Sequence, residues 1–149
     1  MMSREEQLLR TAFVAGAVTD ALALVPMLVP PMARLLWGFE ADSGSYRFAM
    51  GYGASLMLGW TALLVWASRR PLERRAVAAL TVLVIYGLVA TEIAAVATGA
   101  VATWRLVPTW CLQAVLLALF ASAYHYRELS AALARVRREG RDDQKAPLR

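Results

Sequence analysis

Residues 76–104 read AVAALTVLVIYGLVATEIAAVATGAVATW, and Glu92 is the one charged residue among them. A helix needs about 20 consecutive apolar residues to cross the hydrocarbon layer, which is roughly 30 Å thick, at about 1.5 Å of rise per residue. The stretch meets this requirement. We therefore expect a membrane-spanning helix over about residues 76–98.

Three other stretches have the same character. Apart from Asp20, they carry no Asp, Glu, Lys or Arg, and they cover residues 11–33, 48–68 and 106–126. We expect helices over about 11–31, 47–68 and 107–127, the last continuing to about residue 139. The predicted fold class is all-α: a polytopic four-transmembrane-helix bundle over residues 1–139 with a basic C-terminal helical extension. Residues 140–149 are expected to be a disordered basic tail.

The distribution of Lys and Arg predicts the orientation. Of the sixteen such residues, all but Arg34, Arg47 and Arg105 lie in the two tails or between the second and third helices. Cationic segments stay in the cytoplasm, so both termini should be cytoplasmic, in a bacterial inner membrane. The same rule explains the net charge of +5 without a nucleic-acid partner, and membrane lipids are the expected partners. A secretory leader ending near residues 21–23 is the competing interpretation of the N-terminus.

Asp20 is the first candidate functional residue. It follows Arg10 by ten residues, or about 15 Å of helix, which places it near the middle of the bilayer. No Lys or Arg lies at that depth, so we expect a largely protonated carboxyl that faces other helices. A ligand site and a structural hydrogen bond are both open interpretations. Trp60, Thr61 and Tyr86 are the expected neighbours.

Glu92 is the second intramembrane acid. It lies about 25 Å along its helix from Arg75, in the outer third, so its expected depth differs from that of Asp20 by about 10 Å. Gln113 has a comparable depth on the last helix, and Arg47 or Arg105 is close enough in depth to reach the carboxyl. We weigh a polar cluster that fixes the helix ends against a polar mouth of a cavity. Asp20, Trp60, Tyr86, Glu92 and Gln113 are the predicted ligand-pocket residues.

Small residues predict close helix packing. Gly51, Ser55 and Gly59 recur every four residues, which makes the second long helix central in the bundle or part of a homodimer. Gly16 lies one turn before Asp20 and should also allow a helix to approach. In the run VPMLVPP, residues 25–31, the prolines should kink or end the first helix, and residues 32–39 should form a short interfacial segment.

Several chemistries are not expected. Cys111 is the one cysteine and His125 the one histidine, so the sequence offers no intrachain disulfide relay and no credible metal site. No glycine spacing typical of phosphate binding occurs. We predict no catalytic residues and no cofactor.

Residues 46–75, YRFAMGYGASLMLGWTALLVWASRRPLERR, carry a resemblance to a family, with VTDALALVP of residues 18–26 in support. They resemble a group of small, uncharacterised bacterial integral membrane proteins with four helices and no assigned activity. The resemblance implies the fold and no catalytic motif.

Three functions remain open at this stage. The preferred one is a binding or accessory protein that holds a small apolar molecule such as a lipid, a quinone or an isoprenoid. The second is a small proton-coupled transporter that uses Asp20, and the third is a membrane-embedded isomerase or hydrolase. Whether the protein is an enzyme stays open, and the lack of predicted catalytic residues favours a protein that is not an enzyme.

Overall fold

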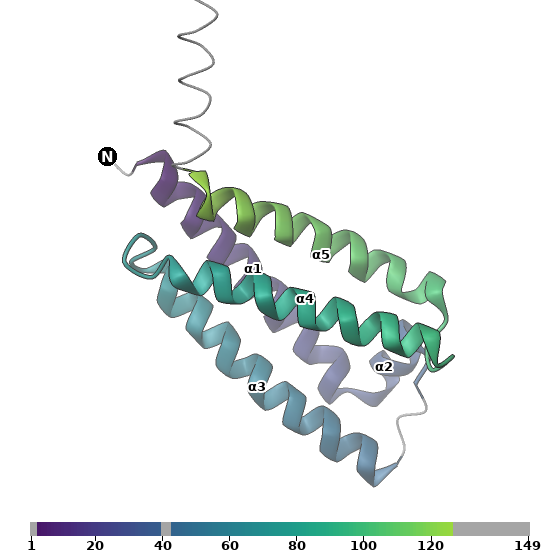
Figure 1. Cartoon of the computed structure of the whole chain (residues 1–149). Helices are drawn as coiled ribbons and strands as arrows, with labels where there is room; N and C mark the ends of the chain where they lie inside the picture. The colour runs from purple at the N-terminus through teal and green to yellow at the C-terminus, as the bar shows by residue number, and fades with distance from the viewer. Residues whose placement is uncertain (1–2, 40–42, 127–149) are drawn as a thin grey trace, which may run out of the picture.

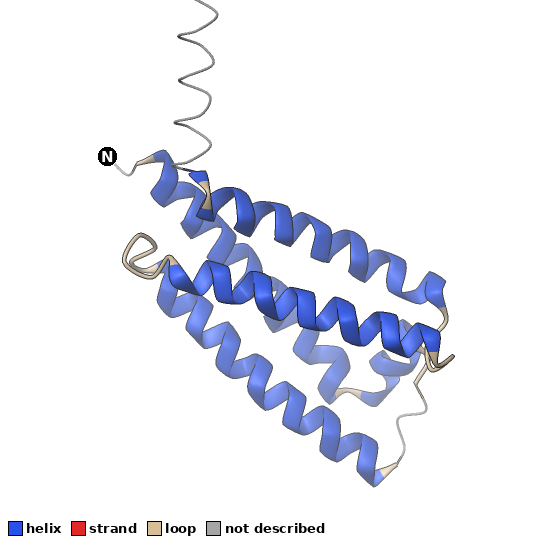
Figure 2. Cartoon of the chain, in the orientation of Figure 1, coloured by secondary structure: helices blue, strands red, loops and turns tan. Residues whose placement is uncertain are grey.

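A computed structural model describes residues 3–39 and 43–126, and over these residues the chain is all-helical and contains no strand (Figure 2). The helices, drawn in Figure 1, are α1 (Arg4–Leu28), α2 (Pro30–Trp37), α3 (Gly44–Ser68), α4 (Ala76–Ala97) and α5 (Thr103–Tyr124). All except α2 are long and apolar enough to cross a membrane. The expected all-helical architecture with four such helices is confirmed, while the expected basic extension lies outside the described residues.

Local sequence explains where α1 and α2 begin and end. The helix α1 begins at Arg4 rather than near residue 11, because the Ser3 hydroxyl accepts a hydrogen bond from the Glu6 N–H at 3.2 Å and caps the first turn. Val29 is extended, and Pro30 opens α2 at its first position, where a missing N–H costs nothing. The helix α2 ends at Gly38, whose φ of +77° is the left-handed conformation that glycine adopts easily.

The helix α1, rather than α3, is central in the arrangement. It packs along α3 and α5 and contacts α2, whereas α4 packs mainly on α5. Although the loop of residues 69–75 joins α3 to α4, the backbones of these two helices come close at few points, and they meet mainly through side chains such as Leu64 and Val77.

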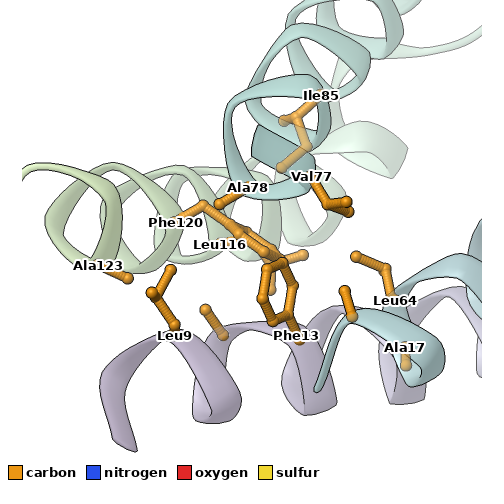
Figure 3. Packing of buried hydrophobic residues seen from close by; sticks show 12 residues of the cluster. Leu9, Phe13, Ala17, Leu64, Val77, Ala78, Ile85, Leu116, Phe120 and Ala123 are labelled. Atoms are coloured by element: carbon orange, nitrogen blue, oxygen red, sulfur yellow. The ribbon is translucent and has the colours of Figure 1, made fainter. Parts of the chain in front are cut away.

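Buried apolar side chains from α1, α3, α4 and α5 gather in one cluster (Figure 3). This apolar cluster consists of Leu9, Ala12, Phe13, Ala17, Leu64, Ala67, Val77, Ala78, Ile85, Leu116, Phe120 and Ala123. The rings of Phe13 and Phe120 lie at its centre, with centroids 6.0 Å apart. A Cβ added at Gly16 would lie only 3.0 Å from the Phe120 ring, so this glycine lets α1 and α5 approach closely.

Arginines hold both ends of the bundle. At the end where Ser3 and Tyr126 lie, which we call the terminal end, the Arg75 guanidinium donates a hydrogen bond to the Tyr124 carbonyl oxygen. At the opposite end, called the α2 end, the Arg105 guanidinium donates to the carbonyl oxygens of Arg34 and Leu35 at 3.3 and 3.2 Å. Arg105 thus ties α2 to the start of α5.

Candidate functional site

The buried face of each long helix changes from apolar to polar just beyond the apolar cluster, on the way to the α2 end. Helical periodicity places Asp20, Trp60, Glu92 and Gln113 close to the faces that carry the cluster residues of their own helices, and Trp110 lies one turn before Gln113 on α5. We call this set the polar layer, and it consists of Asp20, Trp60, Glu92, Gln113 and Trp110.

Two close contacts fix how α1 and α3 lie against each other. A Cβ at Gly16 would lie 3.1 Å from Leu64 Cδ1, and a Cβ at Gly53 would lie 2.9 Å from Met27 Cε. The two contacts lie eleven residues apart on α1, from Gly16 to Met27. They also lie eleven residues apart on the antiparallel α3, from Leu64 to Gly53. Trp60 is therefore level with Asp20, because Asp20 follows Gly16 by four residues and Trp60 precedes Leu64 by four.

Neither of these two polar groups finds a partner. Asp20 is half-buried and forms no hydrogen bond or ion pair within the described part of the chain. The Trp60 indole Nε1 is buried and also lacks a partner. A polar atom removed from water without a hydrogen bond costs free energy, so this level of the α1–α3 contact contains unused hydrogen-bonding capacity.

A second polar group joins α4 and α5. The Gln113 amide Nε2 donates to Glu92 Oε1 at 2.9 Å, which brings together two residues whose depths were predicted to be comparable. The Gln113 side chain is only 6% exposed, and its Oε1 atom has no hydrogen-bond partner. The Glu92 Oε2 atom is also buried and has no hydrogen-bond partner. The Trp110 indole lies beside the same carboxyl, and its buried Nε1 has no hydrogen bond of good geometry.

The two groups are closer in level than the sequence predicted. The contact between Gly16 and Phe120 makes Asp20 level with Leu116, and Gln113 lies three residues beyond Leu116 toward the α2 end. Three residues correspond to about 4.5 Å of helix, compared with the expected 10 Å or so between Asp20 and Glu92. All four long helices therefore contribute polar atoms to one narrow level of the bundle.

Two expected neighbours of Asp20 lie elsewhere. Tyr86 is 60% exposed on α4, so its side chain is largely on the outer surface rather than in the polar layer. The Thr61 hydroxyl donates to the Met57 carbonyl oxygen of its own helix at 2.9 Å. Of the aromatic and hydroxyl side chains considered for Asp20, Trp60 alone is level with it on the facing side of α3.

The cationic residues of the α2 end do not pair with Glu92. Arg105 donates to the carbonyl oxygens of α2, and a Cβ at Gly38 would lie 2.9 Å from its Cζ atom. Glu92 forms no ion pair within the described ranges. The carboxyl therefore belongs to a hydrogen-bonding group that has no cationic partner among the described residues.

The small-residue face of α3 contacts no other helix among the residues that the structure describes. Nothing lies within 4 Å of a Cβ added at Gly51 or Gly59, and the Ser55 hydroxyl donates to the Gly51 carbonyl oxygen at 2.9 Å. This face lies on the far side of α3 from the one that contacts α1. The homodimer contact through it stays a prediction.

A hollow on α1, lined by Gln7, Arg10, Thr11, Val14 and Ala15, lies away from the polar layer. These positions share the face of α1 opposite to Asp20 and belong to the terminal half of the helix. Within residues 3–39 and 43–126, no group of three His, Cys, Asp or Glu side chains is placed to hold a metal ion.

Sequence reasoning missed Trp110. The available signal was its position three residues before Gln113, one turn earlier on the same helix and close to the same face.

No family model matches this chain, and comparisons with curated proteins and with solved structures found no match.

Proposed function

We propose that this protein is an integral membrane protein that binds a small apolar molecule with a polar end, such as a lipid, a quinone or an isoprenoid. The observation that carries the proposal is the polar layer, where Asp20, Trp60, Glu92, Gln113 and Trp110 hold buried or half-buried polar atoms without partners. The polar end of the ligand would pair with these atoms, and its apolar part would lie along the hydrocarbon-facing helices.

Physical cost supports this proposal. Inside a bilayer no water is available to satisfy a polar group, so unpaired atoms in several helices are costly unless another molecule pairs with them. A chain that needed only stable packing would place Leu or Phe at these positions, as it does in the apolar cluster. Polar groups that weaken packing are typical of functional sites.

A loosely packed side of the bundle supports access from the membrane. The backbones of α3 and α4 come close at few points, so side chains rather than a close backbone contact separate the polar layer from lipid along that side. A molecule dissolved in the bilayer would approach the layer laterally, without passing through water.

The test is to identify what the purified protein carries. The protein is extracted in a mild detergent and analysed intact by mass spectrometry, first as wild type and then with Asp20→Leu and Trp60→Phe combined. We expect a small apolar molecule bound to the wild type and its loss from the double variant. Tyr86→Phe is the matched control, because it removes a hydroxyl that is exposed on α4.

The proposal fails if the wild type carries no apolar molecule, or if the double variant retains the same molecule in the same amount. Circular dichroism and gel filtration of each variant check that the helical fold survives. Neither substitution changes a residue of the apolar cluster itself, so loss of the molecule with an unchanged fold assigns it to the polar layer.

We also propose that the protein lies in a bacterial inner membrane with the terminal end in the cytoplasm. The arginines of the described chain support this orientation, since Arg4, Arg10, Arg69, Arg70, Arg74 and Arg75 belong to the terminal end. Of the three arginines at the α2 end, Arg105 has a structural role in holding α2. The resemblance of residues 46–75 to bacterial proteins supports the choice of membrane.

Single-cysteine labelling tests the orientation. In a Cys111→Ser background, Ser3→Cys and Ser45→Cys place one thiol at each end of the bundle. A membrane-impermeant maleimide added to intact spheroplasts should label the cysteine at position 45 and not the one at position 3. The reverse pattern, or equal labelling of both, would refute the proposed orientation.

A further inference from the structure

The contact between α4 and α5 leaves two enclosed oxygen atoms without a hydrogen bond. The Gln113 amide Nε2 donates to Glu92 Oε1 at 2.9 Å, and the other oxygen of each group, Glu92 Oε2 and Gln113 Oε1, has no partner. The Trp110 indole N–H also points toward the carboxyl, in a poorly aligned hydrogen bond. Both leftover oxygens are acceptors when Glu92 is ionised, so the pair of side chains lacks one proton.

An ionised Glu92 would be costly at this place. Within residues 3–39 and 43–126 the carboxyl has no ion pair, and the Arg105 guanidinium donates to the carbonyl oxygens of α2 instead. Gln113 is only 6% exposed, so its amide oxygen is enclosed by the protein. A charge in the hydrocarbon layer without a cation beside it costs much free energy, and taking up a proton removes that cost.

We propose that Glu92 binds a proton on Oε2 and donates it to Gln113 Oε1. One proton taken from water then satisfies both leftover oxygens, and a carboxylic acid and an amide hold α4 to α5 through a pair of hydrogen bonds. A proton needs no cavity, which suits atoms that are fully enclosed. When the proton leaves, two acceptor oxygens remain and the contact between the two helices weakens.

This proton site goes beyond the proposed function and stands without it. It narrows the contacts of the apolar molecule to Asp20 and Trp60, because the polar atoms of Glu92 and Gln113 pair with each other through the bound proton.

The other titratable groups around this pair favour the protonated acid. Asp20 on α1 is the acid closest in level, and a negative charge there would disfavour a second one on Glu92. Arg105 on α5 is held by α2. The remaining titratable residues in this half of the bundle have exposed side chains: Arg34 on α2, Arg47 and Tyr52 on α3, Tyr86 on α4 and Cys111 on α5.

Infrared spectroscopy of the full chain detects the proton directly. The protein is kept in a detergent without ester groups, and its glutamate side-chain carboxyls are labelled with a heavy carbon isotope. We expect a carboxylic acid band at neutral pH that moves with the label and disappears in Glu92→Gln. Glu73→Gln is the matched control, because Glu73 is exposed and pairs with Arg70 at 3.3 Å, so its band pattern should equal that of the wild type.

Gln113→Leu identifies the partner of the acid. This variant removes the amide that donates to Oε1 and accepts from Oε2, so the carboxylic acid band should remain and shift to higher frequency. A purely structural role of Gln113 would leave the frequency unchanged.

The stability of Glu92→Gln gives a second measurement. The new amide N–H takes the place of the acid O–H, so unfolding with increasing sodium dodecyl sulfate should have the wild-type midpoint at acidic pH. As the pH rises, the wild type should unfold at a lower detergent fraction than the variant. The reason is that the unfolded chain releases the proton that the folded chain keeps.

Three results would overturn this inference. The first is a wild type without a glutamic acid band, or a band that persists in Glu92→Gln. The second is a band that Gln113→Leu leaves at the same frequency, since the acid then pairs with another group such as water. The third is the same dependence of stability on pH in the wild type and in Glu92→Gln. The proposed function is judged separately, by the apolar molecule and its loss on changing Asp20 and Trp60.

Discussion

The two halves of the bundle use the same faces of the same helices for different purposes. Toward the terminal end those faces carry apolar residues such as Phe13 and Phe120, which are fully buried against one another. Toward the α2 end they carry Asp20, Trp60, Glu92 and Gln113, which leave polar atoms unpaired. The comparison indicates that the first half supplies the packing that holds the helices together, while the second keeps hydrogen-bonding capacity at a cost in stability.

This division follows from how helices associate in lipid. The surrounding hydrocarbon is as apolar as Leu, so van der Waals packing and interhelical hydrogen bonds hold the helices together. The apolar cluster supplies packing, and Gly16 lets backbones approach there. In the polar layer one side-chain hydrogen bond, between Gln113 and Glu92, joins two helices, so that layer contributes little to stability.

The largest effect should come from the apolar cluster. Phe120→Ala should lower the free energy of unfolding by about 3 kcal/mol, because it leaves a cavity against Phe13, Leu64 and their neighbours. Unfolding in mixed micelles with increasing sodium dodecyl sulfate measures this change. Phe48→Ala, at a position 78% exposed on α3, should change it by less than about 0.5 kcal/mol. Equal losses at the two positions would contradict the division between the halves.

Gly16→Val should have the next largest effect. Its Cβ would lie 3.0 Å from Phe120 and 3.1 Å from Leu64, and overpacking of this kind costs about 1–3 kcal/mol. The same unfolding assay measures it. Gly87→Val introduces the same side chain where nothing lies within 4 Å, so its stability should stay close to that of the wild type. A larger loss at Gly87 than at Gly16 would show that the helices pack differently.

Gly38→Ala should act locally at the α2 end. The left-handed φ of +77° disfavours Ala, and the new Cβ would meet the Arg105 guanidinium at 2.9 Å, so we expect a loss of about 1 kcal/mol. Hydrogen exchange should show faster exchange in α2, with α1 and α5 protected near the apolar cluster. Gly44→Ala, with nothing within 4 Å, is the control. Protection of α2 equal to that of the wild type would refute the role of Arg105 in holding it.

Asp20→Leu should have the smallest effect on stability. Replacing an unpaired, half-buried carboxyl with an apolar side chain removes a desolvation cost. The free energy of unfolding should therefore stay the same or rise by up to about 1 kcal/mol. The bound apolar molecule should be lost in the same variant. A destabilisation comparable with that of Phe120→Ala would mean that Asp20 is a structural residue.

Much of the fold could be predicted because hydrophobic length is a local property. Four apolar stretches fix four helices, and Pro30 and Gly38 mark the bounds of the short helix between them. The depths of Asp20 and Glu92 in the bilayer were harder to predict. Counting residues from Arg10 and Arg75 assumes that each membrane-spanning helix begins at its flanking arginine. The helix α1 instead begins at Arg4, capped by Ser3.

The candidate site was predicted in part. Trp60 and Gln113 were named from their depth alone. In the structure Trp60 is level with Asp20, and Gln113 donates a hydrogen bond to Glu92. Tyr86 was named on the same ground and is exposed, because depth gives the level of a residue and not its face. The role of Arg105 was not foreseen, since the carbonyl oxygens it binds belong to a turn of α2 that is distant in sequence.

The sharpest test of ligand binding at the polar layer is a structure of the protein in lipid nanodiscs, resolved well enough to show small molecules. We predict non-protein density in contact with the Asp20 carboxyl or the Trp60 indole. If these side chains instead pair with one another and nothing else touches them, the polar layer is a structural feature and the account of this protein as a binding protein is contradicted.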